Sequence, residues 1–340
     1  MKLHQAVQQV VHRLTGIAMS LLGLLVMTFL IGRVMPLDPV LAIVGPDADR
    51  STYEQVHRQL GLDQPLAVQF GRYLLSLAHG DLGQALLTGN PVARDLVRVL
   101  PATAELATLA MLIGVLLGVP LGVLAATHHG RWPDHLARVL GLLGHSTPVF
   151  WFGMMGLLVF YAWLGWAGGI GRIGLAFEGN VPTVTGLLLL DAALAGDAPA
   201  WRSALRHLLL PAAVLGLHSM AYLSRMTRAF MLAQLSQEYI TTARVKGLTE
   251  RQVVWGHAFR NIRVQLLTIV ALAYGGLLEG AVLTETVFGW PGFGSYLTGS
   301  LLLGDMNAVM GSVLVIGVLF VSLNLLTDAL YRVFDPRAAA

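Results

Sequence analysis

The chain has 340 residues, of which 55% are hydrophobic and only 12% are charged, and its mean hydropathy is +0.67. Because a soluble domain usually carries about 25% charged residues, this composition argues against a water-soluble enzyme. The net charge of +3 is too small to indicate nucleic-acid binding, and the absence of cysteine excludes disulfides, thiolate nucleophiles and iron–sulfur clusters.

Six stretches between charged residues are apolar enough to form membrane helices. A hydrocarbon core of about 30 Å takes about 20 apolar residues of helix, and unsatisfied backbone groups in lipid favour helices over open sheets. The predicted spans are 14–32, 106–130, 139–171, 207–224, 264–284 and 306–327. We interpret the first as a retained helix, because Val34-Met35-Pro36 is not a small-x-small cleavage site. Pro148 and Pro211 are expected to kink the third and fourth spans.

Two segments outside the spans have ordinary polarity. Residues 36–102 contain several turn signals and enough apolar side chains, among them Phe70 and Tyr73, to predict a small outer domain rather than a disordered loop. Residues 165–204 form a second outer segment. Its apolar part, 184–194, contains Asp191 and is too short to span, so an interfacial or re-entrant helix is expected there.

The distribution of basic residues predicts that both termini lie on the inner side of the membrane. With the N-terminus inside, the inner segments 1–13, 128–138, 225–263 and 328–340 hold 13 of the 22 Lys and Arg residues. The short outer loops hold only three, which are Arg172, Arg202 and Arg206.

The inner loop 225–263 carries seven basic residues and two acidic ones. It is predicted to form two short helices. The first, 236–245, ends at Lys246-Gly247, where the glycine suits a left-handed cap. The second begins with a capping box, Thr249 to Gln252, and places Val253, Val254, His257 and Ala258 on one apolar face. A helix pinned between two spans would act as a lever if a partner moved it; a basic loop that only orients the protein is the alternative.

The residues of this loop carry a resemblance. Glu238 to Leu248, followed by His257-Ala258-Phe259-Arg260-Asn261, is similar to the coupling loop of binding-protein-dependent ABC transporter permeases. The B-type dipeptide permeases of the dipeptide/oligopeptide/nickel subfamily are the most similar group. Further similar segments lie at 60–65, 79–83, 100–106, 284–294 and 335–337, so the resemblance runs nearly end to end in order.

The resemblance implies a fold and a set of partners. The fold is all-α and integral to the membrane, the type I ABC importer permease fold with six transmembrane helices. Its expected parts are residues 1–35 with helix 1, a periplasmic domain 36–102, a permease core 103–334 and a tail 335–340. The implied partners are a second homologous permease, two cytosolic ATPases and an outer substrate-binding protein, in a bacterial inner membrane.

The chain is not expected to be an enzyme. Its only lysines, Lys2 and Lys246, are not part of a P-loop, so ATP and Mg²⁺ are expected to act on the partner ATPases, with no cofactor or metal bound by this chain. The implied ATPase-coupling residues are Glu238, Tyr239, Ala243, Arg244, Gly247, Leu248, Thr249, His257, Arg260 and Asn261.

Polar residues within or beside the spans are candidates for the transport path. Glu279 is a carboxylate well inside a span, where ionisable groups are energetically expensive and functional by default. Glu279 is expected either to line the path, where it could meet a substrate's ammonium group or a metal, or to have a partner at a subunit interface. His145, Ser146, His218 and Ser219 are expected either to line a cavity or to form hydrogen bonds between helices. Glu285 and Trp290 are expected to close the outer face. In the sixth span, small residues such as Gly311 and Gly317 suit close helix contacts.

Short peptides, dipeptides foremost, are the expected substrates, and nickel or metal–metallophore chelates remain an alternative within the same subfamily. From another class, an ATP-independent secondary transporter or channel would be supported by inverted repeats with interrupted helices. No convincing repeat is present in the sequence.

Overall fold

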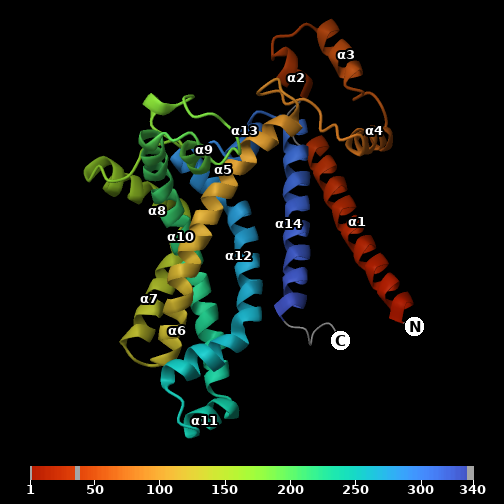
Figure 1. The fold of residues 1–340 in the computed structure, drawn as a ribbon. Coiled ribbons are helices and arrows are strands. Elements are labelled where there is room, and N and C mark those ends of the chain that lie inside the picture. Colours follow the sequence, from red (N-terminus) through yellow and green to blue (C-terminus); the bar gives the residue numbers. More distant parts are fainter. Residues whose placement is uncertain (1, 35–38, 335–340) are drawn as a thin grey trace. The chain divides into compact units, whose positions relative to one another are not determined.

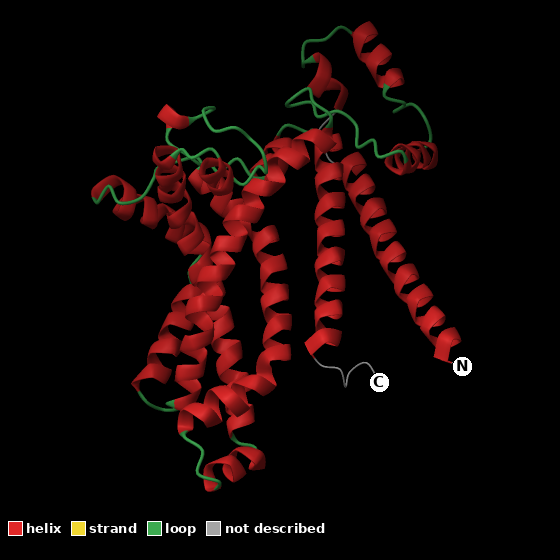
Figure 2. Ribbon diagram, viewed as in Figure 1, coloured by secondary structure: helices red, strands yellow, loops and turns green. Residues whose placement is uncertain are grey.

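A computed structural model describes residues 2–34 and 39–334 of the chain. Over these residues the fold is helical, and the only β-type pairing is an isolated bridge between Gln84 and Pro91 (Figure 2). The chain divides into two compact units. One comprises residues 1–100 and 296–322, and the other comprises 101–295 and 323–340.

The first unit contains the N-terminal helix and the segment after it that is predicted to lie outside the membrane. Its helices are α1 (Lys2–Val34), α2 (Pro39–Val44), α3 (Arg50–Gln59), α4 (Leu66–Ala78), the first part of α5 (Val92–Ile113), most of α13 (Phe293–Leu302) and most of α14 (Met306–Phe334), labelled in Figure 1. The ring of Phe29 in α1 lies 5.2 Å from that of Phe70 and 6.1 Å from that of Tyr73. Phe70 and Tyr73 of the segment 36–102 therefore pack on α1.

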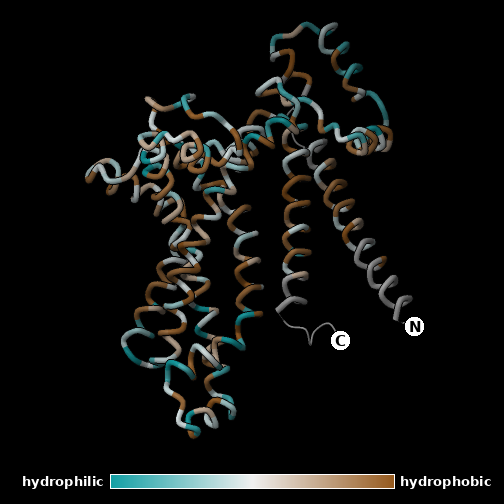
Figure 3. Tube along the Cα trace, in the orientation of Figure 1, coloured by the Kyte–Doolittle hydropathy of each residue, from teal (hydrophilic) through white to brown (hydrophobic). Residues whose placement is uncertain are grey.

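Small residues of α14 permit close helix contacts within the first unit. A Cβ added at Gly311 would lie 2.7 Å from a methyl of Val92, and one at Gly317 would lie 2.3 Å from a methyl of Leu24. The close contacts predicted at these two glycines are confirmed. Figure 3 shows that α14 is largely hydrophobic (brown) over much of its length.

The second unit is built around the 38-residue helix α10 (Ala198–Leu235). Its other helices are η1 (Gly114–Gly118), α6 (Val119–Thr127), α7 (Trp132–Ser146), α8 (Val149–Gly156), η2 (Leu157–Trp163), η3 (Leu175–Phe177), α9 (Leu188–Leu194), α11 (Glu238–Val245), η4 (Gln252–Ala258) and α12 (Phe259–Phe288). The helices α6, α7, α8, α9 and α12 all contact α10. The buried side chains of α10 are therefore the centre of the unit's core.

The predicted spans are recovered in part. Four helices are long and apolar enough to cross a membrane: Val92–Thr127, Ala198–Leu235, Gln252–Leu278 and Met306–Thr327. The predicted third span is a pair of helices, Trp132–Gly144 and Val149–Trp163, bent by 95°. Within the described residues the count is thus four, or five if the bent pair is one span, while Thr15–Leu30 is a shorter apolar helix. The break falls at Pro148, as expected from its missing N–H.

The outer segment of the second unit contains the short helix predicted there. Asp191 lies in α9, fully buried, and accepts hydrogen bonds from the backbone N–H groups of Val184, Thr185 and Gly186. Burial acts to raise the pKa of Asp191, but these hydrogen bonds outweigh it and the pKa is lowered. The charged carboxylate thus fixes the loop that leads into α9.

Three glycines spaced four residues apart bring the helix η1–α6 directly against α10. A Cβ added at Gly114 would lie 2.7 Å from the Cβ of Ser219, and one at Gly118 would lie 2.8 Å from the backbone oxygen of Met220. A Cβ at Gly122 would lie 2.6 Å from the backbone oxygen of Ser224. This is the small-xxx-small pattern that lets membrane helices approach closely.

Candidate functional site

The candidate site is the hairpin of residues 236–261, which connects α10 to α12 and is called the inner-face hairpin after the membrane side that the sequence predicts for it. Its first helix, α11, begins at Glu238, two residues later than predicted, and ends at Val245. Gly247 then adopts φ +83°, the left-handed conformation that the sequence predicts. The N–H of Gly247 donates to the oxygen of Arg244 at 2.9 Å, and that of Leu248 to Ala243 at 3.3 Å, which ends the helix with its carbonyls satisfied.

The predicted capping box is also present. The N–H of Thr249 donates to Oε1 of Gln252 at 3.0 Å, and the N–H of Gln252 donates to Oγ1 of Thr249 at 3.4 Å. The helix that follows is not a separate short helix, because η4 runs without a break into α12. The long helix that continues as α12 therefore begins within the hairpin.

The apolar face predicted for the second helix is partly wrong. Val253, Val254 and Ala258 are buried, as expected, but His257 is exposed. The reason is that η4 is a π-helix, with hydrogen bonds from i to i+5 and more residues per turn than an α-helix. Val253, Ala258 and Val254 then fall within one arc, and His257, which an α-helix would place between Val253 and Val254, falls outside that arc. Ala258 therefore follows Val253 on the buried side and His257 turns outward.

The buried side of the hairpin is seated on three helices. Ile240 and Ala243 of α11 pack in one apolar cluster with Val123 and Ala126 of α6 and Met231 of α10. The buried residues of η4 and Ile262 of α12 belong to the same cluster, and Leu248 packs against it. Movement of α11 would therefore be transmitted to α6, α10 and α12 through close-packed side chains.

Hydrogen bonds join the two arms of the hairpin. The hydroxyl of Tyr239 donates to Oε1 of Gln234 at 2.8 Å, and Nδ2 of Asn261 donates to the same hydroxyl at 2.9 Å. The guanidinium of Arg244 donates from Nε to Oε1 of Glu250 at 2.8 Å, spanning the turn at Gly247. The hydrogen bond to Glu250 raises the pKa of Arg244. These contacts fix α11 against the start of α12.

The opposite side of the hairpin is exposed. Val245 is 83% exposed and Trp255, which packs on Phe259 with ring centroids 5.0 Å apart, is 45% exposed. Neither Val245 nor Trp255 belongs to the predicted coupling set, whose exposed members are Glu238, Arg244, Gly247, Thr249, His257, Arg260 and Asn261. An exposed surface of mixed charge and apolar groups on a rigid support is suited to protein–protein contact.

The sequence analysis did not identify a second feature near the hairpin, the carboxylate of Asp134 near the start of α7. It is fully buried and accepts hydrogen bonds from Nε and Nη2 of Arg228, at 2.6 and 3.0 Å, from Arg138 at 3.0 Å and from the N–H of Gly130 at 2.9 Å. The pair with Arg228 ties the α6–α7 turn to the part of α10 that leads into the hairpin. A gap of 94 positions separates the partners, so spacing alone gives no signal.

Replacing Asp134 with alanine is expected to destabilise the protein by about 3 kcal/mol or more, because removing one partner of a buried ion pair leaves the other uncompensated. The measurement is the melting temperature of the detergent-solubilised protein, determined by size-exclusion chromatography of samples heated to increasing temperatures. Glu54→Ala is the matched control, since its pair with Arg50 is exposed, and it should change stability by less than about 0.5 kcal/mol. Equal melting of the two variants would contradict the structural role of Asp134.

The described members of the predicted path set lie on α10 and at the end of α7. Nδ1 of His218 lies 3.1 Å from the backbone oxygen of Gly144, and Ser219 is buried where Gly114 approaches α10. Ser146 is exposed at the end of α7. The side chains of His145 and Glu279 lie outside the described residues, as does the motif 335–337.

Glu285 and Trp290 form a buried knot at the other end of α12. Glu285 is fully buried; its Oε1 accepts from the hydroxyl of Thr103 at 2.5 Å and its Oε2 accepts from the N–H of Ser295 at 2.9 Å. Trp290 is 1% exposed, and its Nε1 donates to the oxygen of Ala102 at 3.0 Å. Gly292 has no space for a side chain, because a Cβ there would lie 2.4 Å from Oε1 of Glu285. These contacts fix the turn 289–295 to α5.

Thr103→Val is expected to destabilise this knot by about 2 kcal/mol. The valine fills the same space, but it leaves the carboxylate of Glu285 without its hydroxyl donor and the N–H of Phe293 without the acceptor it reaches at 2.7 Å. The measurement is resistance of the outer turns to added protease. Thr108→Val, which loses only an exposed bond to Tyr274, should retain wild-type resistance, and the same resistance in both variants would contradict the role of Thr103.

Comparison with known families identifies the chain. Residues 118–340 match the family described as "Binding-protein-dependent transport system inner membrane component", and residues 6–107 match the N-terminal domain of such membrane components. The chain is 44% identical over 326 residues to the probable D,D-dipeptide transport system permease protein of Escherichia coli K12, covering 96% of this chain and 95% of that protein. It is 37% identical over 329 residues to the di/tripeptide transport system permease protein of Pseudomonas aeruginosa UCBPP-PA14, covering 96% and 97%.

A solved structure shares the fold. A chain of the inward-facing MetNI methionine ABC transporter aligns with a TM-score of 0.52 at 17% sequence identity, over 71% of this chain and 96% of that one. The chain belongs to the binding-protein-dependent transport system inner membrane component family. It is a membrane permease component of an ABC importer, and its family is not one of catalytic enzymes.

Proposed function

We propose that this chain is one of two permease subunits of an ATP-driven importer of short peptides, moved by partners that dock on its inner-face hairpin. The observation that carries the proposal is the construction of that hairpin. One side of α11 packs on α6, α10 and α12, and the other side is exposed. A partner that displaces α11 would therefore tilt the long helices on which it sits.

The partner at the hairpin is a cytosolic ATPase, one for each permease subunit. Glu238, Val245 and His257 supply an exposed surface for helix-in-groove docking, while Gly247 and the Arg244–Glu250 pair hold its shape. ATP and Mg²⁺ are bound by the ATPases, since the chain has no lysine in a P-loop. A second, homologous permease completes the pathway and an outer binding protein delivers the substrate.

We place both termini in the cytoplasm, with six spans. These are α1, the helix α5–α6, the bent pair α7–α8, α10, the helix η4–α12 and α14. The bias of Lys and Arg toward the inner segments supports this orientation. Residues 36–102 form the outer domain of a core that runs from 103 to 334.

Short peptides are the proposed cargo, because relatives that match this chain over nearly their whole length carry names of dipeptide and di/tripeptide transport. No observation favours metal chelates: within the described residues no cluster of three metal-ligating side chains is present. An ATP-independent transporter is disfavoured by membership of a binding-protein-dependent family.

The transport path is proposed to run along α10 and α12, past Ser146, His218, Ser219 and the positions of His145 and Glu279. Glu285 and Trp290 are proposed to keep the outer turn closed until the helices move. Their burial supports this role, because opening the turn would expose a carboxylate and an indole that are now hydrogen-bonded.

Uptake by proteoliposomes tests the function. Vesicles holding this chain, its second permease and both ATPases should accumulate a labelled dipeptide when ATP is inside and the binding protein outside. The control omits only this chain. Uphill accumulation by vesicles that hold this chain alone would contradict the proposal.

A further inference from the structure

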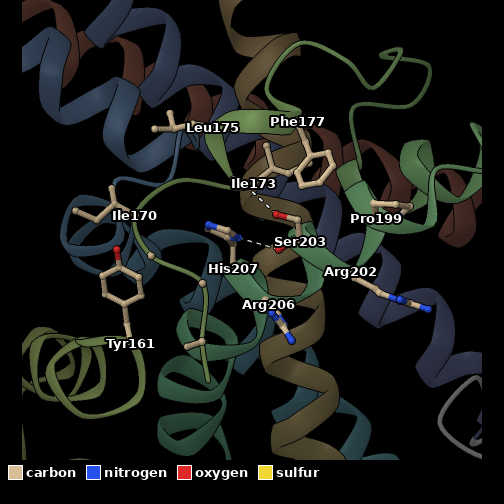
Figure 4. A pocket seen from close by; sticks show the side chains of 14 residues that line it. Tyr161, Ile170, Ile173, Leu175, Phe177, Pro199, Arg202, Ser203, Arg206 and His207 are labelled. Carbon is tan, nitrogen blue, oxygen red and sulfur yellow. Dashed lines mark hydrogen bonds between the residues drawn. The ribbon is translucent and has the colours of Figure 1, made fainter. Parts of the chain in front are cut away.

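A pocket of about 930 Å³ opens at the end of α10 opposite to the hairpin. It is lined by Tyr161 of η2, by the loop 167–177 and by the first turns of α10 (Figure 4). The loop is held to α10 by the N–H of Gly174, which donates to Oγ of Ser203 at 3.0 Å. The pocket is separate from the hairpin, but its loop reaches the turn that holds Trp290: the N–H of Gly171 donates to the oxygen of Phe288 at 2.8 Å, and the guanidinium carbon of Arg172 lies 5.6 Å from the centroid of the Trp290 ring.

One face of α10 supplies the polar lining. Residues 199, 202, 203, 206 and 207 follow the i, i+3, i+4, i+7, i+8 pattern that places them side by side. Figure 4 shows Ser203 and His207 pointing toward the loop, while Arg202 and Arg206 extend away from it along α10. The two guanidinium groups therefore lie at the margin of the pocket, on long side chains free to swing toward an occupant.

The pocket has a one-sided charge. None of its lining residues, all of which the structure describes, is acidic. Arg172, the third arginine of the short outer loops, is paired with Glu105, whereas over the described residues Arg202 and Arg206 have no ion pair. Arginines on the outer side oppose the usual charge bias of membrane proteins, and two unpaired ones mark a surface complementary to an anion.

The spacing of charges along α10 places this pocket at the membrane surface. Between Arg206 and Arg225 the helix carries no Asp, Glu, Lys or Arg. This stretch is about 28 Å long at 1.5 Å per residue, close to the thickness of the hydrocarbon core of about 30 Å. Arg206 is therefore at the depth of the lipid headgroups on one side when Arg225 is at that depth on the other.

The rim of the pocket is apolar and aromatic. Leu175 is 88% exposed and Ile170 is 69% exposed. Trp163 and Trp166, next to the lining residue Tyr161, are 73% and 68% exposed. Amphipathic rings of this kind concentrate at the headgroup level of membranes. Cations beside an apolar rim match a molecule that has an anionic head and acyl chains.

We propose that this pocket binds the phosphate headgroup of an anionic phospholipid, with Arg202, Arg206, Ser203 and His207 contacting the phosphate and the apolar rim contacting the acyl chains. Arginine is suited to this role because its planar guanidinium forms paired hydrogen bonds with phosphate oxygens. The site is independent of the peptide specificity, so it stands or falls separately from the proposed function.

Native mass spectrometry of the assembled transporter tests the proposal. The complex is exchanged into vesicles with equal amounts of phosphatidylglycerol and phosphatidylcholine, extracted with mild detergent, and its retained lipids are counted. Retained phosphatidylglycerol should fall about tenfold in the variant Arg202→Gln/Arg206→Gln. The matched control, Arg94→Gln/Arg98→Gln, removes an exposed i, i+4 arginine pair from α5 and should retain wild-type amounts.

Further arms separate a misfolded variant and a different ligand from the proposed one. Arg202→Lys/Arg206→Lys keeps both charges but not the paired hydrogen bonds, so it should restore part of the retention, which a merely unfolded pocket would not do. Inorganic phosphate at millimolar concentration should not displace the lipid, because it lacks acyl chains. Equal retention of the two lipids, wild-type retention in the glutamine variant, or displacement by phosphate would each overturn the proposal.

Discussion

Replacing Gly247 with valine is expected to abolish substrate-stimulated ATP hydrolysis in the assembled transporter. Gly247 has φ +83°, a conformation that is sterically unfavourable by about 1–2 kcal/mol for an ordinary residue and more for a β-branched one. Open space surrounds the position, with no atom within 4 Å of an added Cβ, so the effect comes from the backbone and not from a collision. The backbone must rotate, which breaks the cap at Ala243 and misplaces α11.

Gly247→Asn is the matched control, because asparagine adopts the left-handed conformation far more readily than valine. It should retain a large part of the stimulated hydrolysis at equal expression. Assembly of the four core subunits is measured for both variants by size-exclusion chromatography. Stimulated hydrolysis and uptake at wild-type levels in Gly247→Val would contradict a rigid hairpin.

Gly122→Leu is expected to prevent recovery of folded, monodisperse protein. An added Cβ at Gly122 would lie 2.6 Å from the backbone oxygen of Ser224 and 2.7 Å from the Cβ of Thr227. The backbone oxygen of Ser224 cannot rotate away as a side chain could, so α6 and α10 must separate along the whole contact. The free-energy cost of this separation is expected to exceed the usual value of about 1–3 kcal/mol for an overpacked core. The measurement is the yield of monodisperse transporter after solubilisation.

Gly23→Leu serves as the control for this variant. Gly23 also lies in an apolar helix, Thr15–Leu30 of α1, but no atom lies within 4 Å of an added Cβ. Its yield should match the wild type. Full recovery of Gly122→Leu would mean that the close approach of α6 to α10 is not required for folding.

Features set by local sequence could be predicted. The left-handed Gly247, the capping box at Thr249 and the break at Pro148 each depend on neighbours within a few residues. The exposure of the His257 side chain could not be predicted, because nothing in the sequence of residues 252–258 indicates a π-helix in place of an α-helix. The predicted periodicity assumed 3.6 residues per turn, which fails where hydrogen bonds run from i to i+5.

Features that depend on tertiary packing were less accessible. The pair of Asp134 with Arg228 joins residues far apart in the chain, and a buried ion pair has no spacing rule. The glycines 114, 118 and 122 follow a visible four-residue period, yet similar spacing occurs on lipid-facing helices, so their partner α10 was recognised only in the structure. The outer pocket likewise forms because a loop folds back on α10, which the sequence of either part alone does not specify.

Site-directed cross-linking tests the central claim most directly, that partners grip the inner-face hairpin. The chain has no cysteine, so a single Val245→Cys, at a position that is 83% exposed, carries one photoreactive probe. We predict that this probe cross-links to an ATPase subunit and that the yield changes when ATP is added. Leu175→Cys, at an equally exposed position on the other side, should cross-link to no ATPase and should react with an impermeant reagent from outside. An ATPase cross-link at Leu175, or none at Val245 in an active transporter, would contradict it.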